Sequence, residues 1–241
     1  MRLLVTRPQP DASLEAEKLV ARGHEPVLAP LFAIEFVGGV TLELAGAQAL
    51  ILTSRNALRA LAAHRQLGEA LKLPLYAVGE ATARAATKLG FKQITIGAGT
   101  GAALAELIAG KLEPEAGPLV HLAGETLAFD LKSALQAKGF SVRQPVLYRA
   151  VPARALPANA LSLLKAGRLD GVILMSPRTA ATFALLVARH GLVTEAQRLV
   201  CYCLSEAVAE AVEPVGASVR VAAQPREEDV LALVDSEAAS S

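Results

Sequence analysis

The chain reads LILTSRNA at Leu50–Ala57 and VILMSPRTA at Val172–Ala180. Each stretch is a short apolar run that ends in a hydroxyl residue and passes directly into a segment of helical period. This combination is typical of a buried strand that feeds the start of a helix, where Ser or Thr caps the first turn. The two stretches therefore predict two equivalent strand–helix units.

A second pair of segments repeats in the same order. Tyr76–Ala83 (YAVGEATA) matches Tyr202–Ala209 (YCLSEAVA), and Gly90 and Gly216 follow at the same offset. The opening of each half also agrees, because a strand, a helix, a glycine and another strand come in turn. These are Leu3–Thr6, Gly23 and Val27–Phe32 in one half and Leu119–Leu122, Gly139 and Val142–Tyr148 in the other.

Alternation of strands and helices predicts an α/β protein with parallel sheets flanked by helices. The duplication predicts two similar lobes, each with about five strand–helix units. The natural ligand site of such a molecule is the cleft between its lobes.

Composition agrees with a two-lobed protein. The chain has 241 residues, of which 53% are hydrophobic, enough for two compact cores. Its apolar runs are far shorter than the ~20 residues that cross a bilayer, so we expect no membrane association. Met1–Pro8 runs straight into a strand-like segment without an export signal, which predicts a cytoplasmic location.

Charge and cysteine content exclude several classes of function. The net charge is +1 without a basic run, which argues against nucleic-acid binding. Cys201 and Cys203 alternate within a strand-like segment and would share one face of a sheet, so buried, reduced thiols are predicted. The four histidines are scattered, and we expect neither a metal nor a cofactor.

Three predicted strands are followed by an arginine, namely Arg7, Arg55 and Arg178. Parallel sheets bind ligands beyond the carboxyl ends of their strands, where helix N-termini add partial positive charge. These positions suit a polyanionic small molecule. The alternative is that the neighbouring Ser54 and Ser176 are simple helix caps and the arginines are solvated.

Other candidate motifs have structural explanations. The cluster Gly97–Gly101 lacks the spacing of a dinucleotide or nucleotide-triphosphate loop, so it predicts a strand-to-helix turn, with nucleotide binding as the alternative. Glu80, Glu125 and Glu206 follow predicted strands and suit the helix dipole better than acid–base catalysis. His121 lies within a strand and is interpreted as a packed residue.

Five segments together resemble the uroporphyrinogen-III synthase family over nearly the whole chain. They are Val5–Pro8, Leu52–Ala57, Ala77–Ala83, Val146–Arg149 and Met175–Pro177, in that order and spacing. The resemblance implies a first lobe of residues 1–34 and 150–241 and a second lobe of residues 39–146. It also implies a two-stranded connector of residues 35–38 and 147–149.

The resemblance implies a reaction as well. Hydroxymethylbilane loses its hydroxyl as water, ring D is inverted through a spiro intermediate, and the macrocycle closes as uroporphyrinogen III, a step of heme biosynthesis. No cofactor takes part, and we expect a monomer. Tyr148 stands where the family has the tyrosine favoured for assisting loss of the hydroxyl. The alternative is that Tyr148 is a strand aromatic that covers a core.

Matching to the family also assigns substrate-binding residues. Thr53, Ser54, Thr82 and Ser176 are expected to line the cleft and to meet carboxylates through hydroxyls or nearby N–H groups. The set is completed by Arg7, Arg55, Gly79, Arg178 and Ser205. Ser205–Ala209 lacks the threonines that family members often carry there, which favours, as the alternative function, a non-catalytic binding or sensory module for an anionic metabolite.

Overall fold

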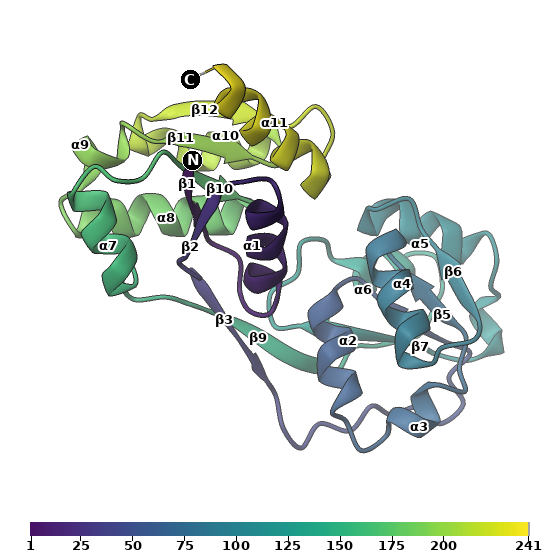
Figure 1. The fold of residues 1–241 in the computed structure, drawn as a ribbon. Coiled ribbons are helices and arrows are strands. Elements are labelled where there is room, and N and C mark those ends of the chain that lie inside the picture. The colour runs from purple at the N-terminus through teal and green to yellow at the C-terminus, as the bar shows by residue number, and fades with distance from the viewer. Residues whose placement is uncertain (241) are drawn as a thin grey trace. The chain divides into compact units, whose positions relative to one another are not determined.

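The computed structural model describes residues 1–240 and confirms the predicted α/β class. The chain divides into two compact units. Unit 1 contains Met1–Ala33 and the chain from Val151 onward, and unit 2 is Ile34–Ala150. Each unit has its own parallel sheet with helices on both faces (Figure 1).

Unit 1 is built on a five-stranded sheet in the order β12-β11-β10-β1-β2, and every neighbouring pair is parallel. Its strands are β1 (Arg2–Val5), β2 (Glu25–Leu28), β10 (Gly171–Leu174), β11 (Val200–Cys203) and β12 (Ser218–Val221). Its helices are α1 (Asp11–Ala21), α7 (Ala158–Lys165), α8 (Pro177–Arg189), α9 (Val193–Ala196), α10 (Glu206–Val212), the 3₁₀ turn η2 (Glu213–Val215) and α11 (Glu227–Ser240).

Both faces of the unit 1 sheet are buried. Leu3, Val5 and Ile173 pack on one face under α1 and α11. Leu4 and Val172, which alternate with them, are also fully buried, and α8 and α10 pack against each other on that side (Figure 1). Strands buried on both faces read as continuous apolar runs, which explains why the sequence shows no polar alternation here.

Unit 2 repeats this arrangement. Its strands are β4 (Ala49–Leu52), β5 (Leu75–Ala77), β6 (Ile94–Ile96), β7 (Leu119–Gly124) and β8 (Val142–Arg143). Its helices are α2 (Arg55–Ala62), α3 (Leu67–Ala70), α4 (Glu80–Leu89), α5 (Gly101–Ala109), the 3₁₀ turn η1 (Pro114–Ala116) and α6 (Leu131–Gln136). The parallel order β8-β7-β4-β5-β6 matches β2-β1-β10-β11-β12 strand for strand, as the duplicated sequence predicts.

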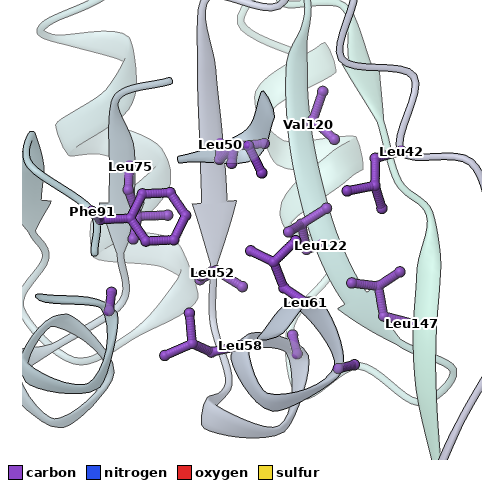
Figure 2. Packing of buried hydrophobic residues seen from close by; sticks show 14 of the residues in the cluster. Leu42, Leu50, Leu52, Leu58, Leu61, Leu75, Phe91, Val120, Leu122 and Leu147 are labelled. Atoms are coloured by element: carbon purple, nitrogen blue, oxygen red, sulfur yellow. The ribbon is translucent and has the colours of Figure 1, made fainter. Parts of the chain in front are cut away.

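Leucines form the core between the unit 2 sheet and helices α2 and α4. Figure 2 shows Leu50 and Leu52 of β4 on the side that faces Leu58 and Leu61 of α2. Ile51 points to the opposite face, where its cluster includes residues of α5 and α6. Burial of β4 on both faces fixes the place where the strand ends, directly before Thr53 and Ser54.

Two strands contain the points at which the chain passes between the units. They are β3 (Phe32–Phe36) and β9 (Val146–Pro152), which are neighbours in the sheet order β3-β9-β7-β4-β5-β6. Backbone hydrogen bonds flank the pair on both sides, because Val37 N donates to Leu147 O and Ala153 N donates to Leu31 O, both at 2.9 Å.

The two cysteines lie on β11 with 0% exposure and form no disulfide, as predicted. Burial raises the pKa of both Cys201 and Cys203 to about 12, so the thiols stay protonated and act as small apolar side chains. In residues 1–240, none of the helices has the length and apolar character that a membrane span requires.

Candidate active site

A pocket of about 620 Å³ opens at the carboxyl edge of the unit 2 sheet. Its wall is made by the loops that follow β4, β5, β6 and β7, the end of β7, the first residues of α5 and α6, and one residue of β9. Ligands of parallel α/β sheets bind at this edge. The lining residues are Thr53, Ser54, Val78, Gly99, Thr100, Gly101, Ala102, Gly124, Thr126, Leu127, Ala128, Phe129, Leu131 and Tyr148.

Tyr148 is the residue that β9 contributes to the pocket. It is half-buried, packs beside the core of Figure 2, and lies opposite Gly124 in the register of β7 and β9. Within the described chain, its hydroxyl has no hydrogen-bond partner. Tyr148 therefore brings a free phenol to the wall of the pocket.

Thr53 is tied to the core by a hydrogen-bonded chain. Its hydroxyl lies 3.1 Å from His121 Nε2, and His121 Nδ1 lies 3.1 Å from Gln144 Oε1. His121 is 1% exposed, and burial lowers its pKa, although the bond to Gln144 opposes the shift. The neutral ring donates from Nδ1 to the Gln144 carbonyl, so Nε2 accepts the hydroxyl proton of Thr53. Thr53 consequently turns lone pairs, not a proton, toward the pocket.

Ser54 caps the N-terminus of α2. Its Oγ accepts a hydrogen bond from Asn56 N at 3.1 Å, which leaves the hydroxyl proton available to another acceptor. Arg55 is the first residue of α2 and is half-buried. The positive end of the helix and the Ser54 hydroxyl thus meet at this corner of the pocket, whereas Arg55 is not among the lining residues.

Gly79 and Thr82 lie at the next helix start and do not line the pocket. Gly79 is the N-cap residue of α4, and the preceding Val78 lines the wall in its place. Thr82, in the first turn of α4, is 5% exposed. Gly79 therefore offers its backbone and Thr82 a mostly buried side chain, and substrate binding by these two residues stays a prediction.

Two loops of the pocket wall are missing from the residues predicted to bind the substrate, although nucleotide binding was the alternative for Gly97–Gly101. Gly97–Gly101 forms the predicted strand-to-helix turn, with Thr100 capping α5 by accepting from Ala103 N at 3.2 Å, and Gly99, Thr100 and Gly101 line the pocket. The loop after β7 adds Thr126 and Phe129. The sequence did contain a signal for these contacts, because both loops follow the carboxyl ends of predicted parallel strands, where ligands bind.

The remaining predicted residues belong to unit 1. Ser176 caps α8 by accepting from Thr179 N at 3.2 Å. Arg178 is exposed, and its guanidinium lies 5.0 Å from the ring centre of Phe32, a cation–π distance. Ser205 is the N-cap residue of α10, but its side chain makes no capping bond.

Arg7 is surrounded by carboxylates of its own unit. Its guanidinium lies 3.1 Å from Asp11, 3.7 Å from Glu15 and 3.2 Å from Glu227. A substrate carboxylate would have to displace one of these groups before it could pair with Arg7. Arg178 has no such ion pair in the described chain and is the more available cation of unit 1.

Comparison with known proteins identifies the family. The family model for uroporphyrinogen-III synthase HemD matches residues 14–232. The chain belongs to the uroporphyrinogen-III synthase family. Uroporphyrinogen-III synthetase of Helicobacter pylori has the same fold, with a TM-score of 0.68, 19% identity and 98% of each chain covered. A mutant uroporphyrinogen III synthase of Thermus thermophilus gives a TM-score of 0.57 at 21% identity, with 100% of each chain covered. A search of curated proteins returns no match.

Membership in the uroporphyrinogen-III synthase family confirms the predicted function. The enzyme is a lyase that converts hydroxymethylbilane to uroporphyrinogen III with inversion of ring D and loss of water. The comparisons give no support to the alternative of a non-catalytic binding module. The structure adds the pocket in which Thr53, Ser54 and Tyr148 of this family member meet.

Glu15 predicts how the stability of this family member depends on pH. The side chain is 0% exposed and neither carboxylate oxygen has a hydrogen bond within the described residues, so burial raises its pKa from 4.5 to about 7, although Arg7 opposes the shift. The folded chain thus keeps this proton at pH values where the unfolded chain loses it. The contribution of Glu15 to the free energy of unfolding is complete below pH 4.5. It falls by about 3 kcal/mol in total as the pH rises to about 7.

Glu15→Gln is expected to remove this pH dependence, because glutamine mimics the protonated acid. At pH 8 the variant should exceed the wild type by about 3 kcal/mol in free energy of unfolding, and at pH 4.5 the two should agree. Urea unfolding at both pH values measures the difference. Glu17→Gln, an exposed position on the same helix, is the control. Parallel pH curves for wild type and Glu15→Gln would contradict the prediction.

Proposed function

We propose that the unit 2 pocket binds the reacting end of hydroxymethylbilane and that Tyr148 is the general acid for loss of the hydroxyl. The observation that carries the proposal is the free phenol of Tyr148 in the same pocket wall as Thr53 and Ser54, beyond the carboxyl ends of four parallel strands. A volume of about 620 Å³ is in the range of small-molecule sites and suits part of a tetrapyrrole.

The proposed chemical step needs only one positioned donor. The phenol of Tyr148 donates a hydrogen bond to the leaving hydroxyl while electrons of the adjacent pyrrole break the C–O bond, and water departs with the transferred proton. The substituted carbon of ring D, which carries the bridge to ring C, attacks the resulting cationic carbon and forms the spiro intermediate. The bridge bond then breaks and leaves the cation on the ring C side, where the unsubstituted carbon of ring D attacks. The proton that this second carbon loses balances the one given to water. The electron-rich pyrrole supplies most of the driving force.

Thr53 and Ser54 are proposed to bind different parts of the substrate. Thr53 gives its proton to His121, so its oxygen suits a pyrrole N–H rather than a carboxylate. Ser54 retains a donor at the N-terminus of α2, beside Arg55, and suits an acetate or propionate group. Arg178, Ser176 and Ser205 of unit 1 are proposed to bind further carboxylates, with Arg7 contributing less because of its internal ion pairs.

The larger task of the enzyme is positional. Hydroxymethylbilane is flexible and closes spontaneously without inversion, so the inverted product requires the terminal ring to be held against the far end of the chain. A substrate held with its reacting groups in place has already lost the conformational entropy that the free substrate would lose on reaching the transition state, so its barrier is lower. We further propose a cytoplasmic monomer, which light scattering of the purified protein tests for its oligomeric part.

Isomer analysis of the product is the experiment that tests the proposed function. Purified enzyme supplied with hydroxymethylbilane is expected to yield the type III isomer, and a reaction without enzyme should yield type I. Oxidation to porphyrins and chromatography separates the two. A product containing only type I at every enzyme concentration would overturn the proposal.

A further inference from the structure

Gly124 lies where β7 meets the ring of Tyr148. It is the last residue of β7, is buried, and pairs with Tyr148 across the β7–β9 register. A Cβ atom built on Gly124 would stand 2.5 Å from Tyr148 Cζ, 2.8 Å from Oη and 2.9 Å from Cε1. The phenol end of Tyr148 therefore rests on the bare backbone of residue 124.

The requirement for glycine comes from this approach and not from the backbone. Gly124 is not among the glycines with positive φ, so its conformation is open to alanine. At the other pocket glycine next to a ring, Gly101, a Cβ would meet Phe129, which is exposed and carried by a loop. Tyr148 is on a strand and packs beside the leucine core, so it has less room to move.

An added methyl group would push the Tyr148 ring away from β7. Carbon atoms in contact lie about 3.5–4.0 Å apart, so the ring end must shift by roughly 1 Å or more. The leucine core lies on one side of the ring and the pocket on another, so the open direction is the pocket. The hydroxyl would then stand away from the position at which it donates to the leaving group.

We infer that Gly124 is a positioning residue that sets the place of the Tyr148 hydroxyl in the pocket. The inference rests on the proposed role of Tyr148 as general acid. A displacement of about 1 Å of a catalytic group can lower turnover about 100-fold. Gly124 would therefore control catalysis without contacting the reacting atoms.

The test compares Gly124→Ala with Gly68→Ala, an exposed glycine of the same unit with open space around its Cα. Gly124→Ala is expected to lower kcat about 100-fold with little change in KM, and Gly68→Ala to leave kcat unchanged. In a Tyr148→Phe background, where no hydroxyl can be misplaced, adding Gly124→Ala should lower kcat by less than about threefold. If the double variant lost kcat by the full product of the two single losses, the inference would be overturned.

A spectroscopic measurement separates this inference from the proposed function. The chain has three tyrosines, so 3-fluorotyrosine labelling gives three ¹⁹F resonances, and Tyr148→Phe identifies that of residue 148. Gly124→Ala should move this resonance and leave those of Tyr76 and Tyr202 in place. A Tyr148 resonance that does not move overturns the inference, whereas normal turnover of Tyr148→Phe alone overturns the proposed function and leaves the resonance test standing.

A compensating variant covers the case in which Gly124→Ala does not fold. If the methyl group fails only because it meets the Tyr148 ring, Gly124→Ala with Tyr148→Leu should recover the thermal transition of Tyr148→Leu. Absence of recovery would show that residue 124 requires glycine for another reason, and would overturn the inference.

Discussion

Tyr148→Phe is expected to lower kcat about 100-fold while KM for hydroxymethylbilane stays nearly constant. Phenylalanine keeps the ring that lies on Gly124 and beside the leucine core, so the shape of the pocket is preserved. The variant lacks only the proton that would be donated to the leaving hydroxyl. A fall in kcat without a rise in KM indicates an interaction made in the transition state.

The isomer ratio is a second readout of Tyr148→Phe. Spontaneous closure competes with the enzyme, so a slower enzyme should leave a larger share of type I product at a fixed enzyme concentration. Tyr76→Phe is the matched control, because Tyr76 is 5% exposed in the same unit and lies outside the pocket wall. Equal kcat values for Tyr148→Phe and Tyr76→Phe would remove Tyr148 from catalysis.

Much of the fold was predictable because each strand is continuous in sequence and each helix start carries a local signal. Ser54 and Ser176 follow equivalent strands and cap equivalent helices, as their matching segments predict. The identical strand orders of the two sheets follow from the same duplication. Local patterns and repeats suffice for most strand pairs, because most neighbouring parallel strands come from consecutive strand–helix units. The central pairs β1–β10 and β4–β7 are the exceptions, since each joins strands that are distant in the chain.

The composition of the pocket wall was harder to predict. Gly124 looks like any strand-ending glycine until the register of β7 and β9 places it opposite Tyr148, and that register shifts between Ala123 and Gly124. The ion pairs of Arg7 were hard to predict for the same reason, because they too depend on contacts between distant segments. Asp11 lies one helical turn beyond it, but Glu227 comes from the far end of the sequence. Periodicity does not report contacts between segments so distant in the chain.

His121 shows how a correct sequence interpretation was incomplete. Its place within a strand predicts a packed residue, and it is 1% exposed. The pairing of β4 with β7 nevertheless sets it beside the end of β4, where it bonds the Thr53 hydroxyl. A buried neutral histidine thus decides whether a pocket residue offers a donor or an acceptor.

Ile51→Ala is expected to lower the free energy of unfolding of unit 2 by about 2–5 kcal/mol. Ile51 is 0% exposed, pairs with Tyr76 and His121 on the neighbouring strands, and packs in a cluster with Leu104 and Ile108 of α5. Truncation removes three carbon atoms from a site closed on both sides, so the energy of a cavity adds to the lost burial. The cavity would lie against β4, the strand that leads directly into Thr53 and Ser54.

Ile96→Ala is the matched control, because it makes the same substitution at the edge of the same sheet. Ile96 ends β6, is 43% exposed, and should cost about 1 kcal/mol or less. Native-state hydrogen exchange can locate the effect, because amides of β4, β5 and β7 should lose protection in Ile51→Ala while those of β10 and β11 in unit 1 are spared. Equal losses for the two isoleucines would show that the β4 core does not hold the pocket edge in place.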